Sequence, residues 1–179
     1  NELERALDLN PRLVQAFAAV EEILTKAKRW TDLEQSYVRM IQRLPKGPEA
    51  AQARLALWKT LGELYRNVLR NDDGARMAYE VVAKADPDDA VSIETYADLA
   101  AKKPGDEVQA IAAYRQLLRT GAKAQKAASA LVTLHAARKE YDLAYSAAQV
   151  LAHLIGGASK EELQVVSRLR KFARDQASR

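Results

Sequence analysis

The chain has 179 residues, of which 48% are hydrophobic and 29% are charged, and it contains no cysteine. This composition excludes a disulfide-stabilised protein and any metal site built from cysteine ligands. No apolar run approaches the roughly 18 to 20 residues that a membrane-spanning helix needs, and residues 1–20 lack the pattern of a signal peptide. We therefore expect a soluble segment, with the cytoplasm slightly favoured among the compartments.

The net charge of +4 is concentrated at the end of the chain. Residues 159–179 carry six basic and three acidic side chains, or +3, which leaves +1 for the other 158 residues. The basic run RLRKFAR at 168–174 fits the solvent-exposed surface of a terminal helix. Because the rest of the chain is nearly neutral, contact with nucleic acid or with a membrane is disfavoured.

The predicted elements are all helices. Alanine occurs 34 times, against 7 glycines and 5 prolines, and apolar residues recur at intervals of three and four, as at Phe17, Val20 and Leu24. Turn sequences such as NDDG at 71–74 and KPGD at 103–106 separate the helical segments. In chain order, ten helices are predicted over residues 1–9, 12–28, 31–43, 48–70, 72–85, 88–102, 106–120, 123–138, 141–155 and 159–176.

One segment carries a recognisable pattern of large and small residues. It comprises Trp58, Leu61, Gly62 and Tyr65, followed by Ala75, Tyr79 and Pro87. This resembles the tetratricopeptide repeat (TPR), a 34-residue helix-turn-helix unit with the consensus W-x2-L-G-x2-Y, A-x3-F and a terminal proline. Weaker copies of the pattern follow the same frame through most of the chain.

The resemblance implies an all-α fold, a right-handed superhelical solenoid of antiparallel helix pairs. We expect a single array: the second half of a truncated repeat at 1–11, repeats at 12–47, 48–89, 90–122 and 123–158, and a C-terminal capping helix at 159–179. The second full repeat has about seven additional residues before Trp58, so its first helix should be unusually long. The half-repeat at the start suggests a fragment of a longer protein.

Few residues could support catalysis, metal binding or cofactor binding. His135 occupies a packing position between two helices and is interpreted as a half-buried structural imidazole, and His153 lies eighteen residues later without a metal-binding motif. NDDG is interpreted as a turn in which Asp72 or Asp73 caps the next helix, and the glycines form no phosphate-binding loop. We therefore predict a non-enzyme with no cofactor, no metal and no small-molecule substrate.

The resemblance also implies a binding surface, because the first helices of successive TPR units line a concave groove that holds a partner peptide or helix. By repeat, the corresponding positions are Gln15, Ala18, Glu22 and Lys26; Ala56, Lys59, Glu63 and Arg66; Val91, Glu94, Asp98 and Lys102; and Lys126, Ser129, Thr133 and Arg138. The charged members are the candidate partner-binding residues.

Two interpretations of these charges remain open. Each acid precedes a base by three or four residues, so the pairs Glu22–Lys26, Glu63–Arg66 and Asp98–Lys102 could neutralise one another within their helices. Alternatively, a partner with alternating charges could bind them. A clamp for the C-terminal carboxylate of chaperone tails, another use of TPR grooves, is disfavoured because Glu63 stands where such clamps have asparagine.

The expected function is a protein-protein interaction scaffold that binds a partner protein or peptide in the groove. One alternative is a substrate-recruiting arm of a larger enzyme whose catalytic domain lies outside the chain. Another is a self-association module that uses the terminal helices.

Overall fold

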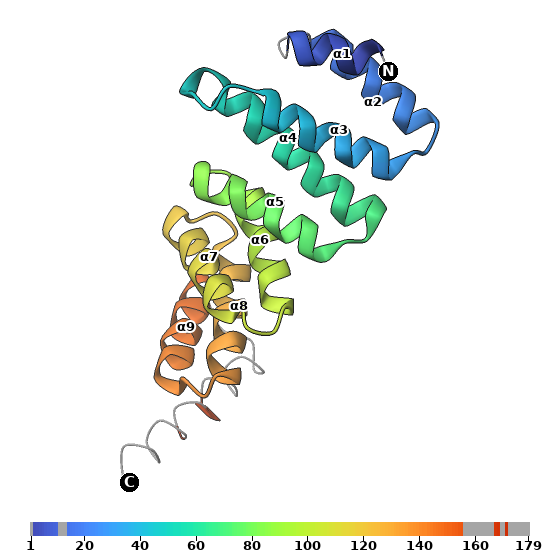
Figure 1. The fold of residues 1–179 in the computed structure, drawn as a ribbon. Coiled ribbons are helices and arrows are strands. Elements are labelled where there is room, and N and C mark those ends of the chain that lie inside the picture. Colours follow the sequence, from blue (N-terminus) through green and yellow to red (C-terminus); the bar gives the residue numbers. More distant parts are fainter. Residues whose placement is uncertain (1, 11–13, 156–166, 169–170, 172–179) are drawn as a thin grey trace. The chain divides into compact units, whose positions relative to one another are not determined.

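A computed structural model describes residues 2–10, 14–155, 167–168 and 171 of the chain. Within these residues every regular element is helical. The elements are α1 (Glu2–Leu9), α2 (Val14–Lys26), α3 (Trp30–Arg43), η1 (Pro48–Ala50), α4 (Ala51–Leu64), η2 (Tyr65–Leu69), α5 (Asp72–Ala85), α6 (Ala90–Lys102), α7 (Glu107–Thr120), α8 (Ala124–Ala137) and α9 (Tyr141–Leu154). Within each of the two units described below, successive helices run antiparallel (Figure 1).

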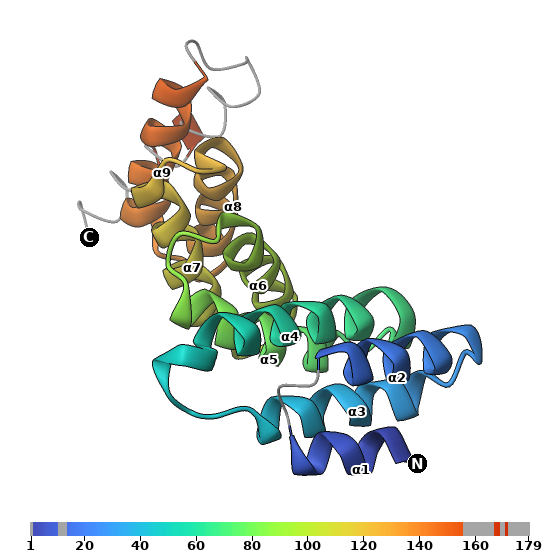
Figure 2. The same cartoon turned by 90° about the horizontal axis from the view of Figure 1, so that it is seen from above.

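The chain forms two compact units, unit 1 at residues 1–85 and unit 2 at residues 86–179. Unit 1 contains α1 to α5, and unit 2 contains α6 to α9. Within unit 1, α3 contacts both α2 and α4 (Figures 1 and 2). The predicted all-α arrangement of antiparallel helix pairs is confirmed. The capping helix expected at the C-terminus, over 159–176, lies largely outside the described residues.

The core of unit 1 is built from large side chains on the inward faces of its helices. α2 supplies Phe17, Val20 and Leu24 at intervals of three and four, as the sequence predicts. The ring of Phe17 meets that of Tyr37 on α3 edge to face, with centroids 5.2 Å apart and planes at 82°. Trp30 and Trp58 are partly buried against this core, so both tryptophans pack within the fold.

The long first helix expected over 48–70 exists as three consecutive helical segments. A 3₁₀ turn at Pro48–Ala50 leads into α4, and α4 continues directly into a π-helical turn at Tyr65–Leu69. A π turn holds one more residue than an α turn, and this is a common way to absorb an insertion. The helix ends with Arg70 in the left-handed region at φ 53°.

The turn after η2 corrects one sequence expectation. The amide of Gly74 donates to Asn71 Oδ1 at 2.9 Å, so Asn71 caps α5. Asp72 and Asp73 are instead the first residues of the helix, where their negative charges interact favourably with the positive end of the helix dipole.

The close approach of α4 and α5 explains the glycine of the repeat pattern. A Cβ atom at Gly62 would lie 3.0 Å from Cε2 of Tyr79, closer than ordinary van der Waals contact. Glycine therefore lets the tyrosine ring of α5 lie flat against α4. This contact joins two residues of the pattern by which the sequence resembles a TPR.

Alanine supplies half of the buried hydrophobic residues in the described part of unit 2. The buried alanines include Ala97 and Ala100 on α6, Ala127 and Ala128 on α8, and Ala144 on α9. Small side chains allow helix axes to approach closely, which accounts for the high alanine content of the chain. The side chain of Asp89 caps α6 by accepting from the amide of Ser92 at 3.1 Å.

Candidate functional site

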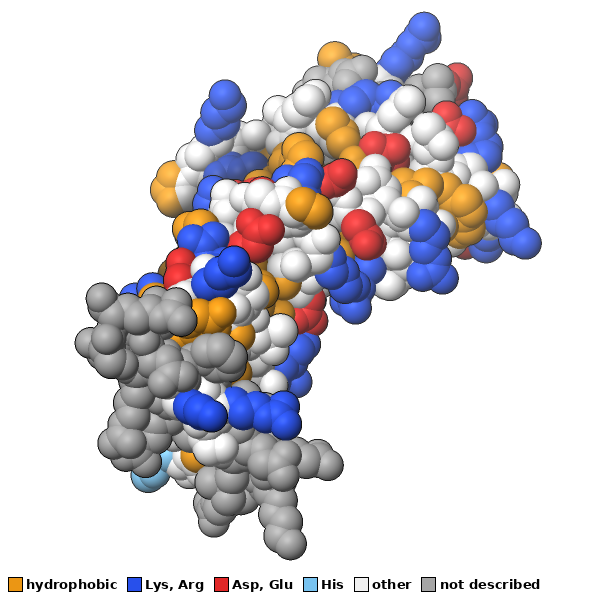
Figure 3. Space-filling view, turned by 90° about the horizontal axis from the view of Figure 1, so that it is seen from below, with side chains coloured by type: hydrophobic (Ala, Val, Ile, Leu, Met, Phe, Trp, Pro, Cys, Tyr) orange, Lys and Arg blue, Asp and Glu red, His pale blue; other side chains and the backbone are white. Residues whose placement is uncertain are grey.

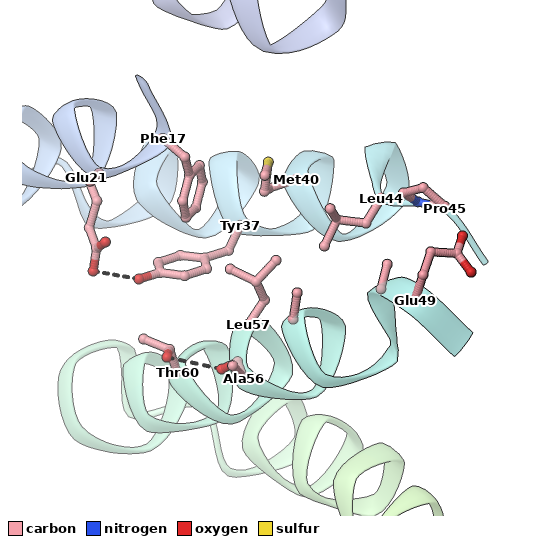
Figure 4. A pocket seen from close by; sticks show the side chains of 13 residues that line it. Phe17, Glu21, Tyr37, Met40, Leu44, Pro45, Glu49, Ala56, Leu57 and Thr60 are labelled. Atoms are coloured by element: carbon pink, nitrogen blue, oxygen red, sulfur yellow. Dashed lines mark hydrogen bonds between the residues drawn. The ribbon is translucent and has the colours of Figure 1, made fainter. Parts of the chain in front are cut away.

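A pocket of about 680 Å³ lies in unit 1 and is lined mainly by residues of α2, α3 and α4. Figure 4 shows its lining from close by. The lining residues are Phe17, Ala18, Glu21, Tyr37, Met40, Leu44, Pro45, Glu49, Ala50, Ala53, Ala56, Leu57 and Thr60.

The pocket is open because its walls are made of small residues. Ala18 on α2 faces the pocket from one side, and Ala53 and Ala56 on α4 face it from the other. All three are exposed, whereas the side chains of α3 below them are buried against the core. The result is an apolar trough whose floor is formed by α3 and whose walls are two first helices.

One end of the trough is marked by a buried tyrosine and a carboxylate. Tyr37 donates its hydroxyl proton to Glu21 Oε1 at 2.6 Å. Burial, the hydrogen bond to Glu21 and the nearby charges of Glu21 and Glu63 all raise the pKa of Tyr37 well above its usual value. Tyr37 therefore remains a donor at neutral pH, and it fixes the position of the Glu21 carboxylate at the edge of the pocket.

The opposite end is marked by a second carboxylate, that of Glu49, next to Pro45 (Figure 4). The Glu49 carboxylate folds back against Gly47, since a Cβ atom there would lie only 2.1 Å from Oε2. The adjoining loop is held by Arg54, whose guanidinium donates to the carbonyl oxygens of Pro45, Lys46 and Gly47. The loop at this end of the pocket is therefore held in place by hydrogen bonds from Arg54 to the backbone.

The corresponding surface of unit 2 is bridged by an ion-pair network. Lys126 Nζ on α8 lies 2.6 Å from Glu94 Oε1 and 2.6 Å from Asp98 Oδ2, both on α6. Burial lowers the pKa of Lys126, but the hydrogen bonds to Asp98 and Glu94 raise it, and the net shift is upward. Lys126 is therefore held charged, and it spans the space between two first helices of unit 2.

A tyrosine-carboxylate pair recurs in both units with the same spacing. Tyr114 on α7 donates to Asp98 Oδ1 at 2.6 Å, sixteen residues earlier, as Tyr37 donates to Glu21. Burial, followed by the Asp98 hydrogen bond, raises the pKa of Tyr114 well above its usual value. A related pair joins η2 to α3, where Tyr65 donates to Glu34 at 2.7 Å, and burial with this bond raises the pKa of Tyr65 to about 12.

The within-helix charge pairs predicted from the sequence form in one case. Glu22 and Lys26 lie 2.5 Å apart on the exposed side of α2. The prediction of an Asp98–Lys102 pair is wrong, because Asp98 instead accepts hydrogen bonds from Tyr114 and Lys126. Among the described residues Glu63 and Arg66 form no ion pair either, and both are exposed.

The remaining candidate residues are spread over both units. Lys59 is half-buried on α4 and Lys102 ends α6. Arg138 lies outside α8, in the turn that follows it, and donates through Nε to Glu140 Oε1 at 2.9 Å. Charges of both signs are interspersed on the face shown in Figure 3.

The groove positions predicted from the sequence include Ala18 and Ala56, which line the pocket, but not the two carboxylates or the floor. Glu21 is not among the predicted groove positions, Glu49 lies in the additional residues before Trp58, and the sequence pattern does not predict that α3 forms a floor. The recurring spacing of sixteen residues between a carboxylate and a tyrosine is a signal that could have identified Glu21.

His135 is fully buried, more so than the half-buried position expected for it, with 3% of its surface exposed. Its Nδ1 lies 2.6 Å from Glu140 Oε2 and its Nε2 lies 3.5 Å from Arg115 Nη2. A carboxylate can only accept, so Nδ1 carries the proton and Nε2 faces the arginine donor. This hydrogen bond lowers the pKa of Glu140 more than desolvation raises it, and Arg138 lowers it further. The arrangement ties the end of α8 to the start of α9.

Other features of the described residues carry no recognisable chemistry. No group of three or more His, Cys, Asp or Glu side chains there could hold a metal ion. In that part of the chain no helix combines the length and apolar character that crossing a bilayer requires. A second pocket of about 640 Å³ lies against α8 and Leu151 of α9, with Lys123 and Lys126 in its lining.

Comparison with solved structures places the chain among helical repeat proteins. The structure of MamA protein matches with a TM-score of 0.60 at 14% identity, over 92% of this chain and 85% of that one. YrrB, described as a TPR protein with an unusual peptide-binding site, matches with a TM-score of 0.56 at 12% identity, over 96% and 84% of the two chains. A TPR protein from Parabacteroides merdae matches with a TM-score of 0.53 at 14% identity, over 98% and 66%. No family model and no curated protein matches the sequence.

Proposed function

Since the chain has the tetratricopeptide-repeat fold, we propose that it is a non-catalytic scaffold that holds a segment of a partner protein in the pocket of unit 1. The observation that carries this proposal is the open apolar trough between α2 and α4, with a floor of large side chains from α3. Its volume of about 680 Å³ lies within the range of roughly 300 to 1,000 Å³ that is typical of ligand-binding pockets.

The trough can supply binding energy through burial of one apolar side chain. A leucine or phenylalanine moved from water into such a site gains about 1.5 to 3 kcal/mol. The walls and floor belong to packed helices, so a partner would meet a preformed surface that loses little conformational freedom on binding. Glu22, Lys26, Glu63 and Arg66 of unit 1 lie on the first helices that form the walls, and in this proposal their charges contribute to partner selection.

Filling the trough tests the proposal. In the Ala56→Trp variant the indole would occupy the space between α4 and α2, so peptides selected from a random display library on the wild-type chain should bind about tenfold more weakly. Affinity is measured by fluorescence anisotropy with labelled copies of the selected peptides. The matched control is Ala112→Trp, at an exposed alanine of α7 that lines neither pocket, which should bind as the wild type does.

Two outcomes would contradict the proposal. One is a selection that yields no peptide binding to the folded wild-type chain. The other is a set of peptides whose affinity is the same for Ala56→Trp and Ala112→Trp, because such peptides would bind somewhere other than the trough. Circular dichroism and the thermal unfolding of each variant establish that the fold is retained.

A further inference from the structure

The charges of the unit 1 pocket are of one sign. Of its thirteen lining residues, only Glu21 and Glu49 are charged at neutral pH, and both are negative. One carboxylate oxygen of Glu21 accepts the hydrogen bond from Tyr37, and within the described part of the chain the other oxygen makes no hydrogen bond. Neither carboxylate forms an ion pair there, which contrasts with the neighbouring Glu22, paired with Lys26.

The two carboxylates stand at opposite ends of the apolar floor (Figure 4). Glu21 is fixed beside Tyr37, and Glu49 lies beside Leu44 and Pro45. Tyr37 and Leu44 are seven residues apart in sequence along the floor, and a rise of 1.5 Å per residue separates them by about 10 Å. The pocket is therefore an apolar trough with one negative charge at each end.

An extended peptide can match this arrangement. In a strand, residues two positions apart point to the same side, and four residues span about 13 Å. A segment whose central side chain enters the trough therefore directs the side chains two residues before and after it toward the two ends. The flexible stems of lysine and arginine cover the remaining difference of a few ångströms.

Resting on the proposed function, we propose that the pocket of unit 1 selects an extended partner segment in which a large apolar residue is flanked, two positions to either side, by lysine or arginine. The apolar residue supplies most of the affinity. The two basic residues determine which sequences bind, and they align the segment along the trough. The acidic ends disfavour segments that carry glutamate or aspartate at the same positions.

Three labelled peptides of defined sequence test this inference by fluorescence anisotropy: GSKSFSKSG, GSESFSESG and GSKSSSKSG. The first should bind most tightly. Exchange of both lysines for glutamate should weaken binding about tenfold, or about threefold for each exposed charge pair, and this difference should shrink at high salt. Replacement of the phenylalanine by serine should weaken binding by at least tenfold.

Protein variants assign the effect to the two carboxylates. Glu21→Gln and Glu49→Gln should each lower the affinity for GSKSFSKSG about threefold and should leave GSESFSESG bound no more weakly. The glutamine at position 21 can still accept the hydrogen bond of Tyr37, so the shape of the trough is kept. Asp72→Asn is the matched control, because this exposed carboxylate of unit 1 lies on α5, outside the pocket lining, and should leave the affinity unchanged.

The outcomes separate this inference from the proposed function. If GSESFSESG binds as well as GSKSFSKSG and both are lost in Ala56→Trp, the charge preference is wrong while the trough remains a peptide site. If GSKSFSKSG binds equally well to the wild type and Ala56→Trp, neither statement holds. Concentration-dependent dimers in light scattering that disappear in Ala56→Trp would identify a second copy of the chain as the occupant and would overturn the inference of a separate partner.

Discussion

The double variant Ala18→Glu/Ala56→Lys is expected to bind pocket-directed peptides at least about thirtyfold more weakly than the wild type, a loss of about 2 kcal/mol. In unit 2, Glu94 on α6 stands at the repeat position of Ala18, and Lys126 on α8 stands at the repeat position of Ala56. Glu94 and Lys126 form an ion pair at 2.6 Å. In unit 1 the same two positions hold alanines that face the pocket from α2 and α4. The double variant would place the unit 2 bridge across the trough and exclude an apolar side chain.

The measurement is the affinity for GSKSFSKSG, accompanied by urea unfolding at neutral pH. The bridge is solvent-exposed, so it should change the free energy of unfolding by no more than about 1 kcal/mol, and the loss of binding would then be due to closure of the trough. Each single variant separates the two parts: Ala56→Lys should weaken binding, because its aliphatic stem covers the floor, whereas Ala18→Glu adds a third carboxylate and should weaken binding less.

The reciprocal variant Glu94→Ala/Lys126→Ala provides the control. It removes the bridge from unit 2 and should leave peptide binding to unit 1 unchanged, with a cost of about 1 kcal/mol in stability. A peptide affinity that survives in Ala18→Glu/Ala56→Lys but falls in the reciprocal variant would contradict the assignment of the site to unit 1.

The sequence predicts the helices well because the signals for them are local. Apolar residues at intervals of three and four, together with turns rich in glycine and aspartate, set most helix limits to within two residues, as at 72–85 and 106–120. The repeat pattern is also informative, since Gly62 and Tyr79 touch in the structure. The π-helical turn at Tyr65–Leu69 was not predicted, because an additional residue can be accommodated either in a turn or within a helix.

The site is harder to predict because it depends on distances between helices. The pairing of acid and base within one helix follows from sequence spacing, and it holds for Glu22 and Lys26. Asp98 finds closer partners on α7 and α8 instead, and the spacing within α6 contains no information about them. The openness of the unit 1 trough depends on alanine at two facing positions, which only the packing of α2, α3 and α4 brings together.

The stability of the chain is expected to fall steeply above pH 10 because of its tyrosine-carboxylate pairs. Burial and hydrogen bonds to Glu21 and Asp98 raise the pKa values of Tyr37 and Tyr114, and burial with Glu34 raises that of Tyr65 to about 12. In the unfolded chain tyrosine ionises near pH 10. The unfolded state therefore loses these protons first, and their contribution to stability, complete below pH 10, is lost as the pH rises toward the raised values.

Each such tyrosine lowers the free energy of unfolding by at most about 1.4 kcal/mol per pH unit in this range. Urea unfolding at several pH values between 9 and 12 measures the slope, and tyrosinate absorbance follows ionisation in the native state. The Tyr37→Phe/Tyr114→Phe variant should be about 2 kcal/mol less stable at pH 7, having lost two hydrogen bonds, and should show a shallower alkaline slope than the wild type. An unchanged slope in this variant would mean that the two carboxylate-bound tyrosines do not govern alkaline unfolding.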